Sequence, residues 1–212
     1  MTKSPVVKSS LLLTEEADKI LRSTAKIIGV SLSNIVCYVI SEIFTETELT
    51  KEKIQDLKDN MKISKLVSIN INNILLDNID SHNKYGLSRR IFLGLIVSEY
   101  LENNRMNLVD GVEDEGNHRI KTQIWIDSDT KKKILNYCNE YSLSINTIIS
   151  LRVIKRKERI ANYHSGNEKE TLDTTFSQSI RNIIEERAGE LSISIRFLIL
   201  LIVNDFLNEK NC

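Results

Sequence analysis

The chain has 212 residues, of which 41% are hydrophobic and 27% are charged, a composition typical of a folded globular protein. Seven glycines and one proline are too few for a fold of many strands and tight turns, so a mainly helical fold is expected. The formal net charge is zero, which excludes a uniformly basic nucleic-acid-binding chain and makes the local distribution of charge decisive.

The first predicted elements are a strand and two helices. With Leu11 and Leu13 facing inward, the strand shows Lys8, Ser10 and Leu12 outward. Thr14 is the candidate N-cap of a helix whose apolar residues recur with 3.6-residue spacing. The turn Gly29-Val30-Ser31-Leu32-Ser33 then leads to a second helix that ends Val39-Ile40-Ser41-Glu42-Ile43-Phe44.

The same order returns in the next part of the chain. The alternating segment Val67-Ser68-Ile69-Asn70-Ile71 predicts a strand that shows Leu66, Ser68 and Asn70 outward, and Asn72 is the helix cap. The turn Gly86-Leu87-Ser88-Arg89-Arg90 leads to a helix that ends Ile96-Val97-Ser98-Glu99-Tyr100-Leu101. The match to the first copy predicts a repeated unit.

Two more copies follow. The third strand, Lys121 to Ile126, shows Lys121, Gln123 and Trp125 outward, and the expected cap is Asp127 or Ser128. The fourth strand shows Thr171, Asp173 and Thr175 and is followed by the cap Ser177. The turns before the second helices are Ser142-Leu143-Ser144-Ile145-Asn146 and Ser192-Ile193-Ser194-Ile195-Arg196, and the last of these helices ends Ile202-Val203-Asn204-Asp205-Phe206-Leu207.

The four copies are regularly spaced, because the anchor serines 31, 88, 144 and 194 lie 57, 56 and 50 residues apart. A single strand has no partner, so two copies are expected to pair their strands as an antiparallel ribbon with four helices behind it. Pairing of adjacent copies is favoured, and pairing between two chains is the alternative. Residues 1–110 would then hold one pair, at about 5–47 and 64–104, and residues 117–212 the other, at about 118–160 and 169–210. The segments 51–62, 110–118 and 164–170 are polar enough to be linkers, and the first is also compatible with a helix.

This order, with a Gly-Val-Ser-x-Ser-like turn between the helices, resembles the ribbon-helix-helix superfamily of Arc and MetJ type repressors. The resemblance covers nearly the whole chain four times, and its most specific elements are Ile28 to Val36 and Gly86 to Ile91. It implies a mainly α fold with short β-ribbons, arranged as four tandem units in two pseudo-dimeric domains. It also implies that the ribbons read base edges in the major groove, while the start of each second helix holds a phosphate.

The resemblance and the outward strand positions together name candidate DNA contacts. A helix N-terminus can hold a phosphate, although a serine there could equally serve only to cap the helix. The starts of all four second helices are therefore plausible phosphate clamps, namely Ser31 to Ser33, Ser88 to Arg90, Ser144 to Asn146 and Ser194 to Arg196. The base-contact candidates are Lys8, Ser10, Ser68, Asn70, Lys121, Gln123 and Trp125, and the phosphate-contact candidates are Ser31, Ser33, Ser88, Arg89, Arg90, Ser144, Asn146, Lys131, Lys132 and Lys133.

Charge is distributed unevenly along the second half of the chain. Residues 119–160 carry ten Lys or Arg against four Asp or Glu, whereas residues 161–212 carry five against eight. The basic helix end around Arg152, with Lys155, Arg156, Lys157 and Arg159, is expected to contact the DNA backbone. Asp173 and the acidic surroundings suit the fourth copy to the role of a structural partner.

Motifs for catalysis are missing from the sequence. His82, His118 and His164 show no metal-ligand spacing with the cysteines 37, 138 and 212, which are expected to be buried or free thiols. No glycine-rich phosphate loop or HExxH motif occurs. We expect no enzyme, cofactor or metal. The longest apolar run, Phe197 to Val203, is too short to span a bilayer, so a cytoplasmic protein is expected.

Two classes of function remain. The first is a sequence-specific double-stranded DNA-binding protein, either a transcriptional repressor or a partition or conjugation accessory of plasmid or phage origin. The second is a protein-interaction module, antitoxin-like or scaffold, that kept the fold. Zero net charge, the outward Leu12 and Leu66, and Asp173 favour the second class. A homodimer or a protein partner is compatible with either class.

Overall fold

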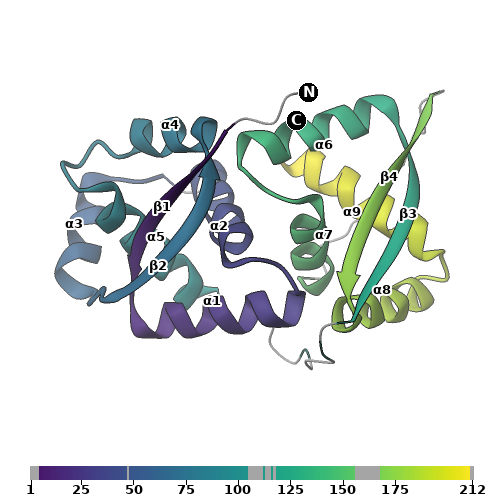
Figure 1. Cartoon of the computed structure of the whole chain (residues 1–212), viewed down its shortest axis with the longest axis horizontal. Coiled ribbons are helices and arrows are strands. Elements are labelled where there is room, and N and C mark those ends of the chain that lie inside the picture. The colour runs from purple at the N-terminus through teal and green to yellow at the C-terminus, as the bar shows by residue number, and fades with distance from the viewer. Residues whose placement is uncertain are drawn as a thin grey trace. The chain divides into compact units, whose positions relative to one another are not determined.

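The computed structural model describes residues 5–46, 48–104, 112, 116, 118–155 and 168–210. It confirms a mainly helical fold of four successive β-α-α units (Figure 1). The first two units are β1 (Val6–Leu13), α1 (Glu15–Ile28) and α2 (Leu32–Glu46), and β2 (Lys65–Asn72), α4 (Asn73–His82) and α5 (Arg89–Asn103). The last two are β3 (Arg119–Asp127), α6 (Ser128–Glu140) and α7 (Ile145–Ile154), and β4 (Lys169–Ser177), α8 (Gln178–Glu190) and α9 (Ile195–Glu209).

The expected linkers have different outcomes. The first contains the helix α3 (Lys51–Asn60), which confirms the helical alternative for that segment. Thr50 caps α3 because its side chain accepts a hydrogen bond from the Lys53 amide. Most of segment 110–118 and residues 164–167 lie outside the described residues, and residues 169 and 170 belong to β4 rather than to a linker.

Strands of adjacent units pair within the chain. β1 is antiparallel to β2, with Ser10 opposite Ser68, and β3 is antiparallel to β4, with Gln123 opposite Asp173. The favoured pairing of first with second copy and of third with fourth is therefore confirmed. Each half of the chain is a pseudo-dimer built around one two-stranded ribbon.

The inward face of each ribbon belongs to the core of its half. In the first ribbon, Leu11, Leu13 and Ile71 have no exposed surface, and in the second ribbon Ile124 and Ile126 have none. Second helices pack across the pair, because α2 contacts β2 and α5 contacts β1, while α7 contacts β4 and α9 contacts β3. Each strand is thus covered by the second helix of its partner unit, which explains why a single unit could not bury its own apolar surface.

Capping groups begin the helices at the predicted positions. Asn72 and Ser177 cap α4 and α8, while Thr14 and Asp127 accept from the amides of Ala17 and Thr130 at the starts of α1 and α6. Burial opposes ionisation of Asp127, but hydrogen bonds from Thr130 and from the backbone of Asp127 and Asp129 together outweigh it and lower the pKa of this carboxyl.

The turn between the two helices of each unit has one recurring conformation. The residue two positions before the anchor serine has a positive φ in all four units: 74° at Gly29, 68° at Gly86, 55° at Ser142 and 54° at Ser192. Glycine adopts this left-handed conformation without strain, whereas serine does so at some cost. The first two copies have the sequence Gly-x-Ser and the last two have Ser-x-Ser, and both sequences adopt the same turn conformation.

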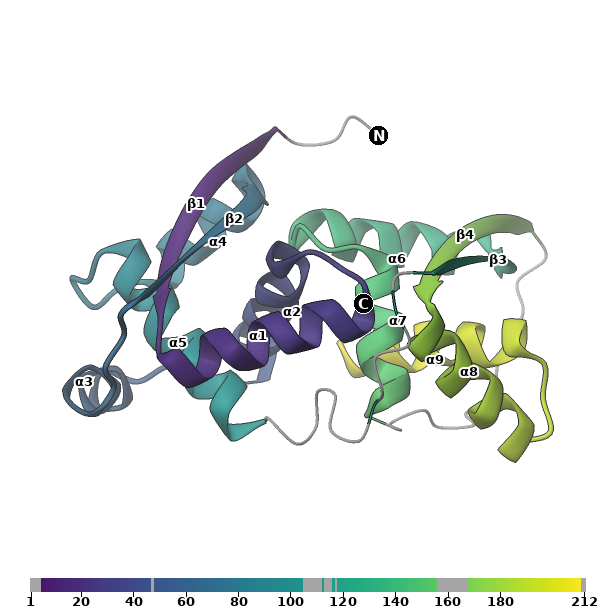
Figure 2. The same cartoon turned by 60° about the horizontal axis from the view of Figure 1, so that its bottom comes forward.

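The contacts of the chain divide it into two compact units that correspond largely to its first and second halves. Within each half, both views show the ribbon lying along one side of the helices (Figures 1 and 2). Among the described residues, no single helix has the length and apolar character needed to cross a membrane, and the pair α1 and α2 meets these criteria only when taken together, with a bend of 111° between them.

Candidate nucleic-acid interface

The outward face of the first ribbon carries the side chains that the sequence predicts. Lys8, Ser68 and Asn70 are exposed and Ser10 is half-buried, while the intervening Val67 and Ile69 are buried. The register places Lys8 opposite Asn70 and Leu12 opposite Leu66. Leu66 is 57% exposed and Leu12 is half-buried. We call the Lys8–Asn70 pair the polar end of this face and the Leu12–Leu66 pair its apolar end; Val6, which is 64% exposed, lies beyond the polar pair.

The outward face of the second ribbon is built in the same way. Lys121, Gln123, Trp125 and Asp173 are exposed, and Trp125 keeps 57% of its surface accessible. At the centre, Gln123 Nε2 donates a hydrogen bond of 2.9 Å to Asp173 Oδ1 directly across the ribbon. This bond fixes the orientation of the Gln123 amide and leaves the second carboxylate oxygen of Asp173 available as an acceptor.

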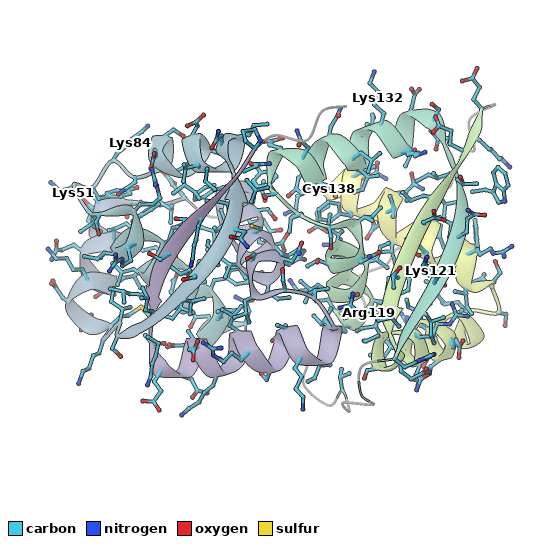
Figure 3. All side chains as sticks on the ribbon, viewed as in Figure 1. Lys51, Lys84, Arg119, Lys121, Lys132 and Cys138 are labelled. Carbon is cyan, nitrogen blue, oxygen red and sulfur yellow. The ribbon has the colours of Figure 1, made fainter. Side chains whose placement is uncertain are left out.

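On the outward face of the second ribbon, exposed basic side chains outnumber exposed acidic ones. Arg119, Lys121 and Lys169 share the outward face with Asp173 and are all exposed. Figure 3 places Arg119 and Lys121 along this ribbon and Lys132 on helix α6. The partner strand β4 therefore contributes an acid to the centre of a face that is basic at its edges.

The anchor serines cap the second helices in every unit. Ser31, Ser88, Ser144 and Ser194 each accept a hydrogen bond from the backbone amide three residues later, over 3.2 to 3.4 Å. The capping role is thereby confirmed, and the phosphate role of these serines stays a prediction. A serine that accepts from an amide can still donate its hydroxyl proton, so the two roles are compatible, although Ser144 Oγ also lies 2.8 Å from Thr147 Oγ1.

Two of the predicted phosphate contacts, Ser33 and Asn146, accept hydrogen bonds from the ribbon strands. Ser33 Oγ accepts from the backbone amide of Asn70 over 2.9 Å, and Asn146 Oδ1 accepts from the amide of Thr175 over 3.0 Å. Both side chains lie two residues after the anchor serine of their unit. They tie the start of α2 to β2 and the start of α7 to β4.

The other two units place arginine at this position. Arg90 and Arg196 are exposed, and no ion pair is found for either within the part of the chain that the structure describes. A guanidinium group has no acceptor atom, so it cannot take over the strand contact made by Ser33 and Asn146. Both arginines belong to the helix starts that were predicted to hold a phosphate, and that role stays a prediction.

Close packing holds the start of α5 beside β1. Gly94 lies against the backbone of Leu12, and a Cβ atom at Gly94 would stand 1.9 Å from the Leu12 carbonyl oxygen. Arg90 is four residues before Gly94 and therefore on the same side of α5. The exposed Arg90 is thus held near the apolar end of the first ribbon.

Intramolecular partners engage two further predicted phosphate contacts. Arg89 makes a bidentate interaction with Asp80, with Nε to Oδ1 at 2.8 Å and Nη2 to Oδ2 at 2.5 Å. The hydrogen bond from Arg89 lowers the pKa of Asp80. Lys131 lies 2.6 Å from Glu170 Oε2. Lys132 and Lys133 are exposed on α6.

The expected DNA contact of Arg152 is wrong. Only 2% of this residue is exposed, and its guanidinium group hydrogen-bonds to Glu209 and, over 3.4 Å, to Asp205. It also lies 5.6 Å from the ring centroid of Phe206. Arg152 therefore joins α7 to α9 in the interior of the second half. The sequence pattern alone had indicated an exposed basic helix end. Arg156, Lys157 and Arg159 lie outside the described residues.

The cysteines behave as expected for buried thiols. Cys37 and Cys138 are free and buried, and burial raises the pKa of each thiol to about 12. Cys212 lies outside the described residues. No group of three or more histidine, cysteine or acidic side chains that could hold a metal ion occurs in the described ranges.

No family model, curated protein or solved structure matches this chain. Functional inference consequently rests on the repeated fold and on the contacts of the two ribbons.

Proposed function

We propose that this chain is a sequence-specific double-stranded DNA-binding protein of the ribbon-helix-helix type that acts as a transcriptional repressor. The observation that carries the proposal is the pair of antiparallel ribbons whose outward faces bear Lys8, Asn70, Lys121 and Gln123. The major groove of B-DNA admits a two-stranded ribbon, and these side chain types hydrogen-bond base edges there.

Phosphate contacts would come from the starts of the second helices. Arg90 and Arg196 each project from the N-terminal turn of a second helix, where free backbone amides and the helix dipole also favour an anion. Each ribbon would determine the sequence that is read, and the arginine of the same half would hold the DNA backbone beside that ribbon.

Partition or conjugation accessory proteins of plasmids and phages would use the same interface. The position of the bound DNA site, in a promoter or beside a transfer or partition origin, distinguishes such a role from repression.

A protein-interaction module is the second candidate, and exposed apolar side chains favour it. Val6 is 64% exposed and Leu66 and Trp125 are each 57% exposed on the ribbons. A partner strand or helix could cover them. DNA binding accounts for the same residues, because apolar side chains also contact thymine methyl groups in the major groove.

The two functions differ in their response to salt. We would titrate a labelled mixed-sequence duplex with the whole chain at several salt concentrations and follow fluorescence anisotropy. The test variant is Arg90→Gln with Arg196→Gln. The matched control is Lys51→Gln with Lys58→Gln, which removes two exposed cations from α3, a helix outside the four units.

We expect the arginine variant to bind more weakly and to lose about 2 from the slope of log affinity against log salt, one phosphate contact per arginine. The control should keep the slope of the unmodified chain. Equal slopes in all three proteins, or salt-independent binding, would refute the proposed phosphate contacts and favour the interaction module.

A further inference from the structure

The two ends of each ribbon are related positions of the repeat. Counting back from the caps Thr14 and Asn72, Lys8 and Leu66 each lie six residues before the cap, while Leu12 and Asn70 each lie two residues before it. The register pairs Lys8 with Asn70 and Leu66 with Leu12. If the two units were identical, both ends of the ribbon would carry the same pair of side chains.

The first ribbon departs from this symmetry. Lys8 and Asn70 form a polar end, whereas Leu12 and Leu66 form an apolar end. Lysine donates hydrogen bonds to guanine O6 and N7 and asparagine binds adenine, whereas aliphatic side chains contact the methyl group of thymine. The chemistry of this face therefore differs from one end to the other.

The second ribbon departs from symmetry in the same sense. Lys121 is opposite Thr175 toward one end, and Trp125 is opposite Thr171 toward the other, with Lys169 beyond it. As in the first ribbon, the lysine comes from the first strand of the pair and the bulky apolar residue follows it four positions later on the same strand. Two independent pairs of units thus have the same polarity.

Arg90 follows this polarity as well. Gly94 places the start of α5, and with it Arg90, beside Leu12 at the apolar end of the first ribbon. The polar end has the neutral Ser33, which binds the Asn70 amide. In the second half, Asn146 binds the Thr175 amide at the lysine end. Each ribbon therefore has a lysine end, defined by Lys8 or Lys121 and held by a neutral side chain, and an apolar end, defined by Leu12 or Trp125.

We infer that each ribbon reads an asymmetric DNA subsite, with guanine at its lysine end and thymine at its apolar end. A two-fold symmetric ribbon would read an inverted repeat, because the symmetry of a site mirrors that of the protein. The inference rests on the proposed DNA-binding function and adds the base classes and the direction in which each ribbon reads them.

The first test is selection of bound duplexes from a random pool by the whole chain. We expect subsites with guanine at one end and thymine at the other. Enriched subsites that are inverted repeats would overturn this inference and leave DNA binding intact. The absence of any enriched sequence would contradict the proposed function, and this inference with it.

A variant can make the first ribbon symmetric. Leu12→Asn with Leu66→Lys would give both ends the polar pair that Lys8 and Asn70 now form at one end. We expect this variant to select an inverted repeat for one subsite and to leave the other subsite unchanged. The matched control, Leu12→Ala with Leu66→Ala, removes the apolar groups without adding donors and should lose the thymine preference alone. Unchanged selection by the symmetrised variant would contradict the assignment.

Uracil provides a measurement that needs no variant. Replacing a contacted thymine by uracil removes only its methyl group, and we expect binding by the unmodified chain to weaken about fourfold per methyl group. The alanine control, confirmed as folded by circular dichroism, should not respond to uracil in the first ribbon's subsite. Equal binding of the thymine and uracil duplexes by the unmodified chain would refute the apolar contact.

Discussion

A buried ion-pair cluster joins α7 to α9 and permits a sharp prediction of stability. Arg152 is 2% exposed, whereas the side chains of its partners Asp205 and Glu209 are 13% and 35% exposed. Removing both carboxylates, by Asp205→Asn with Glu209→Gln, leaves a cation that cannot reach water. Removing Arg152 leaves two carboxylates that can still contact water. The two perturbations should therefore have unequal costs.

The magnitudes follow from burial. Breaking a buried ion pair from one side costs about 3–5 kcal/mol, and we expect about 3 kcal/mol for the carboxylate variant because Glu209 is partly solvated. Arg152→Met should cost less than about 1 kcal/mol, since a buried ion pair exchanged for apolar packing is often neutral. Val39, Ile96 and Ile202 occupy the same repeat position in the other units and are buried there.

Urea unfolding measures these costs. Trp125, the single tryptophan of the chain, reports on the second half through its fluorescence, and circular dichroism reports on all helices. The midpoint should fall strongly for the carboxylate variant at an unchanged denaturant slope, and adding Arg152→Met to it should restore most of the loss. A larger loss for Arg152→Met than for the carboxylate variant would refute the reasoning.

Four further predictions concern single substitutions. Gly94→Ala should lower the free energy of unfolding by about 1–3 kcal/mol because its Cβ would meet Leu12, whereas Gly189→Ala, with open space around it, should raise that energy by about 0.5–1 kcal/mol in the same urea experiment. Ser192→Gly should be stabilising because φ is 54° there, and a lower midpoint would contradict the strain. The lowered pKa of Asp127 means that its contribution to stability is present above the unfolded pKa of about 3.9 and is lost as pH falls through the folded pKa. Asp127→Asn should therefore flatten the acid limb of a pH titration of stability, and an unchanged limb would exclude this carboxyl as a contributor.

Much of the fold could be predicted because local patterns determine it. Alternation in Val67 to Ile71 fixed which face of β2 is buried, and the side chain oxygens of Thr14, Asn72 and Ser177 marked the helix starts. The order of the units was predicted from the repeat, since four similar turns at regular spacing exclude most other arrangements. The pairing of adjacent units then followed from the need of each strand for a partner.

The candidate site could be predicted only in part, because sequence does not show which polar groups already have partners. Ser33 and Asn146 bind strand amides, Arg89 binds Asp80, and Arg152 is buried against α9. Each of these contacts joins residues far apart in the chain or in separate elements. Arg90 and Arg196 show the opposite case, because the repeat predicted their place at the starts of second helices and both residues are exposed.

The central claim is that the ribbons enter the major groove, and methylation protection by dimethyl sulfate tests it most directly. The reagent modifies guanine N7, which lies in the major groove, and adenine N3, which lies in the minor groove. On a duplex enriched by the chain from a random pool, we predict protection of guanine N7 next to the lysine ends and no protection of adenine N3. Protection confined to adenine N3, or a chain that enriches and protects no duplex at all, would contradict the account.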